Sequence, residues 1–245
     1  MTNVFGVPIE GWTIGRMLDL LTHQQQEPVW IVTANPEILL EASQDRTYAE
    51  TLRRATMRTV DGFGLWMVLR FMNEKTSRVS GVDLAERLLK DAEREGWRVG
   101  FFGGQHGVAE EAAERQRTIH PRLVVRAEQG GAVEQDGSDD RASEEARRRL
   151  TLFDPQVMLV ALSFPAQERW IEKHLNDFPT LRIIVGVGGT FDYWSGRVRR
   201  APEIVRRVGL EWMWRLAHQP RRLIRIWRAV VLFPWKVLRT PDHRD

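Results

Sequence analysis

The chain of 245 residues contains no cysteine. Disulfide bonds, cysteine-ligated metals and thiol nucleophiles are therefore excluded, which fits a cytosolic protein. The first residues have no basic stretch leading into an apolar core, so we expect no secretory signal. No apolar run approaches the roughly 18–20 residues that cross a bilayer. The longest runs, such as VMLVAL, have the length of interior strands, and we expect a soluble or surface-attached protein.

The motifs of several common chemistries are missing as well. The six histidines have no metal-ligand spacing, and no G-x-S-x-G elbow or D-x-D pair is present. Asp139 and Asp140 occur in a polar loop before a helix, where capping is the simpler role. A site without a metal needs arginines to neutralise phosphate, and the chain is rich in them. We therefore expect neither a metal nor a cofactor.

The composition is that of a globular protein, with 42% hydrophobic residues, 28% charged residues and no low-complexity tract. The formal net charge is only +3, but it is unevenly placed. From Arg197 onward there are 13 basic and 4 acidic residues, a net charge of +9, whereas the preceding part carries −6. This asymmetry predicts an anionic partner for the C-terminal part: nucleic acid, a membrane surface or a phosphorylated substrate.

Apolar runs of strand length alternate with helical stretches over most of the chain. NVFGVPI, VWIVTA, WRVGFFGG, PQVMLVAL and LRIIVGVGG are such runs, and a helix is expected from about Glu37 to Thr51. The alternation predicts parallel βαβ units, hence an α/β fold with a Rossmann-like, mostly parallel sheet covered by helices on both faces. The remaining part is helical and rich in Arg and Trp. We therefore expect an α/β catalytic domain over residues 1–196 and a basic helical appendage over residues 197–245.

Polar side chains follow two of the predicted strands, and ligands of open α/β sheets bind beyond the carboxyl ends of the strands. Thr33 and Asn35 lie two apart, so on an extended chain both face the same side. Asn35 is suited to cap the next helix, but a hydroxyl and an amide on one face also suit binding of a sugar or a nucleotide. Asp61 and Gly62 form a common turn pair. A carboxylate held at a strand exit is also the place for a general base, but the residues alone favour the turn.

Two further strand exits are rich in glycine. VGFFGGQHG contains Gly103 and Gly104, and IIVGVGGTFD contains Gly188, Gly189 and Asp192. Neither segment matches the full Rossmann fingerprint or the P-loop signature, and glycines also permit close strand–helix packing. The order of strand, glycine turn and helix nevertheless suits phosphate binding at a helix N-terminus. Two such exits favour a phosphorylated ligand more than either does alone.

The C-terminal segment RLAHQPRRLIRIWRAVVLFPWKVLR consists of two helical pieces divided by Pro220. In the second piece, apolar side chains recur with helical spacing, and arginines group on the other side. This pattern, with Trp, is typical of a helix that lies in the plane of a membrane surface. A helix packed on its own core with a solvated basic face is the alternative. Nucleic acid is less favoured, because no helix-turn-helix, RNP or finger pattern accompanies the charge.

These pieces, in this order, resemble the WecG/TagA/CpsF family of bacterial glycosyltransferases. The resemblance covers nearly the whole chain, from VFGVPIEGWT to RLAHQPRRLIR. Several segments match in register: TANPEILLEASQD, VDGFGLWMVLR, RVSGVDL, FFGGQHGVAEEAAE, PAQERWI, GVGGTFDYWSGRVRRAP and GLEWMWRLAHQPRR.

The resemblance implies an inverting, metal-independent enzyme. It would transfer an N-acetylhexosamine, N-acetylmannosamine-like or related, from a UDP-sugar to a polyprenyl-diphosphate-linked sugar acceptor in cell-wall or exopolysaccharide synthesis. The implied partners are the UDP-sugar, the lipid-linked acceptor and the inner surface of the cytoplasmic membrane, and not nucleic acid. A monomer and a small homo-oligomer are both compatible with it.

The resemblance also implies roles for particular residues. Asp61 matches the family's proposed base, which takes a proton from the acceptor hydroxyl, and Thr33 and Asn35 match the polar pair of its pocket. Gln167 matches the pocket glutamine, and Arg78 lies near the pocket arginine. Three further arginines belong to an appendage thought to close over the active site at the membrane: Arg215, Arg222 and Arg225.

Two departures from the family pattern bear on the donor. Ser163 replaces a glycine and Ala166 replaces a lysine beside PAQERW. The loss of a cation near a diphosphate predicts weaker donor binding or a different donor. A catalytically silent partner that binds sugar nucleotide or lipid in an envelope-assembly complex is therefore an alternative hypothesis, and a basic nucleic-acid-binding protein is a second.

Overall fold

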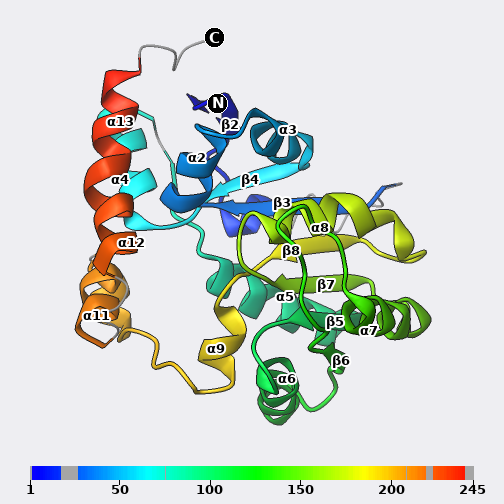
Figure 1. Ribbon diagram of the computed structural model, residues 1–245. Coiled ribbons are helices and arrows are strands. Elements are labelled where there is room, and N and C mark those ends of the chain that lie inside the picture. Colours follow the sequence, from blue (N-terminus) through cyan, green and yellow to red (C-terminus); the bar gives the residue numbers. More distant parts are fainter. Residues whose placement is uncertain (1, 18–26, 75, 208, 219–222, 241–245) are drawn as a thin grey trace.

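The computed structural model of the protein describes residues 2–17, 27–74, 76–207, 209–218 and 223–240. A six-stranded sheet lies at its centre (Figure 1), and every neighbouring pair of its strands is parallel. The strand order is β4-β3-β8-β7-β5-β6. The α/β fold with a parallel sheet is thus confirmed. The strands are β3 (Val29–Ala34), β4 (Met57–Val60), β5 (Arg98–Gly103), β6 (Val124–Glu128), β7 (Val157–Ala161) and β8 (Ile183–Gly186).

Helices cover both faces of this sheet, so alternate residues of a central strand enter two different cores. Trp30 and Val32 of β3 belong to one core, and Val29 and Ile31 belong to the other. A strand buried on both faces is apolar throughout, which is why VWIVTA reads as a continuous apolar run. The first core is covered by α2 (Pro36–Ala42), α3 (Arg46–Arg54), α4 (Phe63–Phe71), α7 (Arg141–Phe153) and α8 (Ala166–His174), which continues into the 3₁₀ turn η1 (Leu175–Asp177). The second is covered by α5 (Gly81–Glu95), α6 (Val108–Ile119) and α9 (Thr190–Trp194).

The run NVFGVPI, expected as a strand, forms a hairpin outside the main sheet. β1 (Thr2–Val4) pairs antiparallel with β2 (Val7–Ile9). Phe5 and Gly6 between them have φ angles of 52° and 79°, the left-handed backbone of a tight two-residue hairpin turn. The glycine at the second position makes this turn accessible.

The helix expected from about Glu37 to Thr51 is two helices, α2 and α3, so that prediction was wrong. Asp45 begins the second helix. Its Oδ1 accepts a hydrogen bond from the backbone N–H of Tyr48 at 3.0 Å, which is the geometry of an N-cap. The break at Asp45 limits α2 to seven residues, which follow directly after Asn35 at the end of β3.

The C-terminal part is helical, as expected, and packs along α4 and α2 (Figure 1, orange to red). A Cβ on Gly64 of α4 would lie 2.4 Å from the backbone oxygen of Ala229, so the two segments are in very close contact. Phe233 and Val237 are fully buried in the first core. Among the described residues, no helix is both long and apolar enough to cross a membrane. The elements are α10 (Glu203–Arg207), α11 (Glu211–His218), α12 (Leu223–Trp227), the π-helical turn η3 (Arg228–Leu232) and α13 (Phe233–Arg239).

Candidate active site

The carboxyl ends of β4, β3 and β8 lie side by side, because β3 pairs with both of the others. On one side of β3 lies β4, the next strand along the chain. On the other side lies β8, which is the last strand in the sequence although it is central in the sheet. Such a reversal in strand order opens a crevice beyond the carboxyl ends, where ligands of α/β proteins bind. Asp61 directly follows β4, Thr33 is near the end of β3, and Gly188 and Gly189 follow β8. The structure therefore gathers these four residues at one edge of the sheet.

Asp61 is partly buried at the exit of β4. Its backbone N–H donates to the oxygen of Ala34 at 2.8 Å, and its Oδ2 accepts a hydrogen bond from the N–H of Gly81, the first residue of α5, at 3.4 Å. The pKa of the carboxyl is raised from 3.8 to about 6, and desolvation is the largest cause. The charge of Glu211 also raises this pKa, whereas the Gly81 hydrogen bond and the charge of Arg215 lower it. A carboxyl with this pKa is mostly ionised at neutral pH and more basic than an ordinary aspartate. Asp61 therefore has the properties of a general base.

Thr33 is buried beside this carboxyl. Its hydroxyl donates to the backbone oxygen of Gly186 in β8 at 2.9 Å. A Cβ on Gly81 would lie 3.5 Å from the same hydroxyl oxygen, so Thr33 adjoins the backbone that binds Asp61. Because its proton is engaged with the main chain, Thr33 offers a ligand an acceptor lone pair.

Asn35 caps α2, which is the simpler of the two roles expected for it. Its Oδ1 accepts hydrogen bonds from the N–H groups of Glu37 at 2.9 Å and Ile38 at 3.1 Å. The cap engages Oδ1 and not the Nδ2 amino group, which is a donor. Glu37 also forms two contacts of 2.7 Å with the guanidinium of Arg225 from α12. The appendage therefore reaches the N-terminus of α2 beside Asn35.

Gln167 is 4% exposed and joins the exits of β7 and β8. Its Oε1 accepts from the N–H groups of Leu162 at 3.3 Å and Gly188 at 3.0 Å. Its Nε2 donates to Glu168 at 2.7 Å, and the Tyr48 hydroxyl donates to the same carboxylate at 2.8 Å. Both ends of the Gln167 amide thus hold protein groups, so in this arrangement it positions the Gly188 loop. Sequence reasoning missed Glu168 and Tyr48, although Glu168 directly follows the selected Gln167 in PAQERW.

Arg215 of α11 lies over the ring of Tyr193, with 5.3 Å from the guanidinium carbon to the ring centroid. Its Nη2 is 3.4 Å from Glu211, and its Nε is a buried donor with no hydrogen-bond partner among the described residues. The charge of Arg215 lowers the pKa of Asp61, and the charge of Asp61 raises the pKa of Arg215, so the two groups interact electrostatically. Neither Tyr193 nor Glu211 was predicted, because only the folded chain brings Arg215 of α11 over the ring of Tyr193 in α9.

The remaining predicted arginines differ in position. Arg78 precedes α5, and its Nη2 donates to the backbone oxygen of Arg206 in α10 at 2.5 Å. The adjacent N–H of Val79 donates to Val60 of β4 at 2.9 Å, which keeps Arg78 near the exit where Asp61 lies. Arg222 lies outside the described residues.

The two predicted glycine pairs have different surroundings. Gly103 has a φ of 95°, and a Cβ there would lie 2.6 Å from the oxygen of Ala161, so close packing alone requires a glycine. Gly104 follows it at the exit of β5, about 14 Å from β3 across three strand spacings. A Cβ on Gly188, by contrast, would meet no described atom within 4 Å. Gly188 thus borders open space at the crevice.

Gly189 and Asp192 form the start of α9. A Cβ on Gly189 would lie 3.4 Å from Asp192 Oδ2, so the carboxylate turns back toward the glycine loop. Among the residues that the structure describes, no group of three His, Asp or Glu side chains could hold a metal ion. The site as described offers a carboxylate base, an arginine and a glycine loop, which together suit proton abstraction next to an anionic group.

Similarity to known proteins extends along nearly the whole chain. The model of the family described as "Glycosyl transferase WecG/TagA/CpsF family" matches residues 2–244. A Bacillus spizizenii protein named N-acetylglucosaminyldiphosphoundecaprenol N-acetyl-beta-D-mannosaminyltransferase is 36% identical over 220 residues, which are 89% of this chain and 81% of that protein. A Staphylococcus aureus (strain MRSA252) protein of the same name is 28% identical over 240 residues, 96% of this chain and 91% of that protein. The chain therefore belongs to the WecG/TagA/CpsF family and is a glycosyltransferase.

Proposed function

We propose that the protein transfers N-acetylmannosamine, or a related N-acetylhexosamine, from a UDP-sugar to a polyprenyl-diphosphate-linked N-acetylglucosamine. The observation that carries the proposal is the similarity, over 89% of the chain, to a relative named for that acceptor and that transfer. The position of Asp61 at the strand-order reversal supports it. The product would serve the synthesis of a cell-surface polymer.

In the proposed mechanism, Asp61 takes the proton of an acceptor hydroxyl while that oxygen attacks the anomeric carbon. The new bond forms on the face opposite the UDP, so the configuration inverts, and the electrons of the broken carbon–oxygen bond pass to the diphosphate. The pKa of about 6 means that the base is mostly ionised at neutral pH. Thr33 would accept a hydrogen bond from a sugar hydroxyl, and the Nδ2 group of Asn35 would donate one.

The leaving diphosphate gains negative charge, which fixed cations and backbone N–H groups stabilise. Arg215 is one candidate for this role; in support, its buried Nε has no partner among the described residues and its charge acts on Asp61. Arg78 is a second candidate, and the open loop at Gly188 can present backbone N–H groups. In this proposal arginines take the place of a metal ion.

The acceptor is anchored in a membrane, so the enzyme must work at its surface. Six large apolar side chains of the C-terminal segment are 50–73% exposed. They lie on the helices that also carry Arg225 and Lys236. We therefore propose that the segment binds peripherally to the inner face of the cytoplasmic membrane and helps to close the site. The six are Leu223, Ile224, Trp227, Val231, Trp235 and Leu238.

An Asp61→Asn variant tests the reaction. We expect UDP release from a panel of UDP-sugars to depend on a short-chain polyprenyl-diphosphate-N-acetylglucosamine acceptor. The variant should lose activity by roughly 10²–10⁴-fold, the usual contribution of a general base. Binding of UDP, measured by calorimetry, should stay close to that of the wild type because Asp61 faces the acceptor.

The silent-partner hypothesis makes the opposite prediction for the same assay. Ala166, which replaces the family's lysine, is 4% exposed at the start of α8, so this position offers no cation to a diphosphate. UDP binding without turnover of any donor would favour a binding partner. No UDP binding at all would contradict the proposed site.

A further inference from the structure

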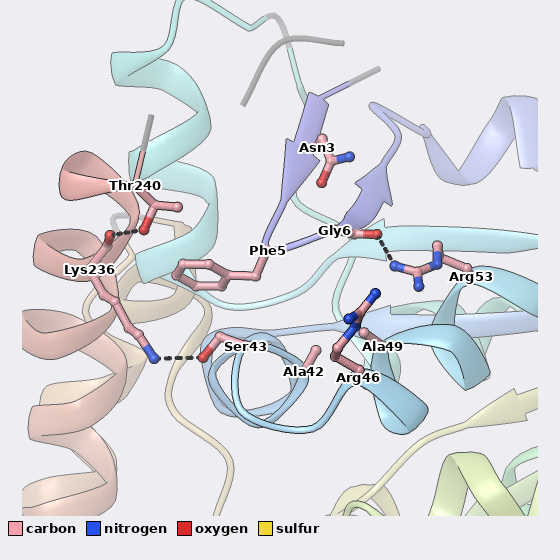
Figure 2. Close-up of a pocket in the computed structure, with 10 residues that line it drawn as sticks. All are labelled: Asn3, Phe5, Gly6, Ala42, Ser43, Arg46, Ala49, Arg53, Lys236 and Thr240. Atoms are coloured by element: carbon pink, nitrogen blue, oxygen red, sulfur yellow. Dashed lines mark hydrogen bonds between the residues drawn. The ribbon is translucent and has the colours of Figure 1, made fainter. Parts of the chain in front are cut away.

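A cavity of about 480 Å³ lies apart from the candidate active site, between the β1–β2 hairpin, the α2–α3 junction and the end of α13 (Figure 2). Ten residues line it, and none of them belongs to the candidate active site. Asn35 is at the N-terminus of α2, whereas Ser43, which lines the cavity, follows the C-terminus of that helix. The seven residues of α2 separate the two places by about 10 Å.

Three of the lining residues are cations and none is acidic. Arg46 and Arg53 are seven residues apart on α3, which is two turns, so they share one face of the helix. Lys236 comes from α13, on the other side of the cavity (Figure 2). The fold thus brings together three positive charges that are far apart in the sequence.

The cations keep hydrogen-bond donors that the protein does not use. The Arg46 guanidinium has no hydrogen bond or ion pair with any described residue. Arg53 Nη1 donates to the backbone oxygen of Gly6 at 2.8 Å, and its Nη2 is 3.9 Å from Glu50 in an ion pair. Lys236 Nζ donates to Ser43 Oγ at 2.7 Å. A guanidinium has five N–H donors and an ammonium has three, so these contacts leave most of them available.

Like charges around one cavity repel one another, and an anion inside it relieves that repulsion. Two guanidinium forks and an ammonium, approaching from different directions, match an anion with several oxygen atoms. The exposed Trp235 and Leu238 lie on the same helix as Lys236, so the cavity borders a helix that is proposed to face lipid. We propose that the cavity binds a phosphate-bearing anion, from either an anionic phospholipid headgroup or a soluble phosphate.

The test compares matched pairs of variants in the full-length protein. Arg46→Gln and Lys236→Gln each remove one charge from the cavity. Arg54→Gln on α3 and Arg239→Gln on α13 remove the same charge from the same helices outside it. Arg54 is 69% exposed in its ion pair with Glu172, and Arg239 stacks on Trp235 at 4.4 Å. Each variant is titrated with inorganic phosphate by calorimetry, and with phosphatidylcholine vesicles with and without phosphatidylglycerol by sedimentation.

Each cavity variant should weaken binding roughly tenfold, the effect of one charge-assisted hydrogen bond, whereas each control should change it by less than about twofold. A loss in the vesicle experiment identifies the lipid headgroup as the source of the phosphate, and a loss confined to inorganic phosphate identifies a soluble ligand. Equal losses in cavity and control variants, or no loss with either probe, would overturn the proposal.

Three further measurements keep the result interpretable. Urea denaturation checks folding, which Arg46→Gln should not disturb because the side chain has no described partner. Arg46→Lys, which restores a cation, should recover part of the affinity. UDP binding should be the same in all variants, so a failure of this proposal is distinguishable from a failure of the proposed glycosyl transfer.

Discussion

At the scale of single residues, most of the predicted polar positions hold backbone groups. Thr33 fixes Gly186, Asn35 fixes the first turn of α2, and Gln167 fixes the loop at Gly188. Asp61 also accepts a backbone N–H, which lowers the pKa of its carboxyl, but burial raises this pKa by more. The site therefore combines a rigid polar frame with one carboxyl that is held in an unfavourable environment for its charge.

The raised pKa of Asp61 predicts a pH-dependent stability. The folded protein holds this proton more tightly than the unfolded chain, so the contribution to stability is complete below the ordinary pKa of 3.8 and is lost as the pH rises through about 6. Asp61→Asn carries no charge to desolvate. At neutral pH it should be more stable than the wild type, by at most about 3 kcal/mol.

Urea denaturation at about pH 4 and at about pH 7.5 measures this difference, because the linkage acts between those values. The gain should be close to zero in acid and positive at the higher pH. Glu145→Gln, which removes a carboxylate that is 54% exposed on α7, is the control and should show no such gain. A less stable Asp61→Asn at the higher pH would contradict the assignment of a desolvated carboxyl.

At the scale of elements, contacts at both ends and in the middle of residues 223–240 attach the C-terminal segment to the α/β part. Arg225 pairs with Glu37 at the start of α2, and Lys236 bonds to Ser43 beyond its end. Between them, Gly64 of α4 lies against the backbone of Ala229. The segment therefore runs in the same direction as α2, and these contacts fix its position against α2 and α4. The boundary between residues 196 and 197 remains a prediction, although the two parts share one core.

Gly64→Ala should separate α4 from the C-terminal segment. Its Cβ would lie 2.4 Å from a backbone oxygen, which cannot move as a flexible side chain does. We expect a loss of about 1–3 kcal/mol in the free energy of unfolding and lower acceptor-dependent activity. Gly15→Ala is a matched control in another helical segment, where a Cβ would meet no described atom within 4 Å. It should be neutral or slightly stabilising. An unchanged Gly64→Ala would contradict the close contact.

At the scale of the whole molecule, some apolar residues of the C-terminal segment are buried in the core and others are exposed. Phe233 and Val237 are buried in the core, and the Phe233 ring meets Phe5 edge to face at 6.0 Å. Ile224 and Leu238 are 73% and 68% exposed. The sequence offered two alternatives for the C-terminal segment, packing on the core or presenting apolar side chains outward. Different residues of the segment do each of these.

This division predicts that membrane binding can be weakened without unfolding the protein. The double variant Ile224→Gln and Leu238→Gln should reduce sedimentation with phosphatidylglycerol-containing vesicles by roughly tenfold or more, since burying such a side chain contributes about 1.5–3 kcal/mol. Leu152→Gln on α7, where the native leucine is 87% exposed, should bind vesicles as the wild type does. Equal binding by all three proteins would contradict a lipid-facing appendage. Truncation is a poorer test, because it would also remove Phe233 and Val237 from the core.

The sequence by itself determined the class of the fold and the family of the protein. Strands buried on both faces are apolar throughout, so their alternation with helices could be recognised in the sequence. The order of the motifs indicated the family. The concentration of positive charge after Arg197 was also a property of composition alone. These features depend on residues that are close together in the sequence or on the overall composition. They can therefore be predicted without knowing any tertiary contact.

Only the tertiary structure decided how those pieces act on one another. Tyr48 and Glu168 are 120 positions apart, and Glu37 and Arg225 are 188 apart. The pKa of Asp61 depends on burial and on the charges of the distant Glu211 and Arg215. The cavity beside Arg46 exists only because α13 returns to the N-terminal hairpin. Burial, charge coupling and cavity shape arise from contacts between distant segments, and local residue patterns do not encode which distant segments meet.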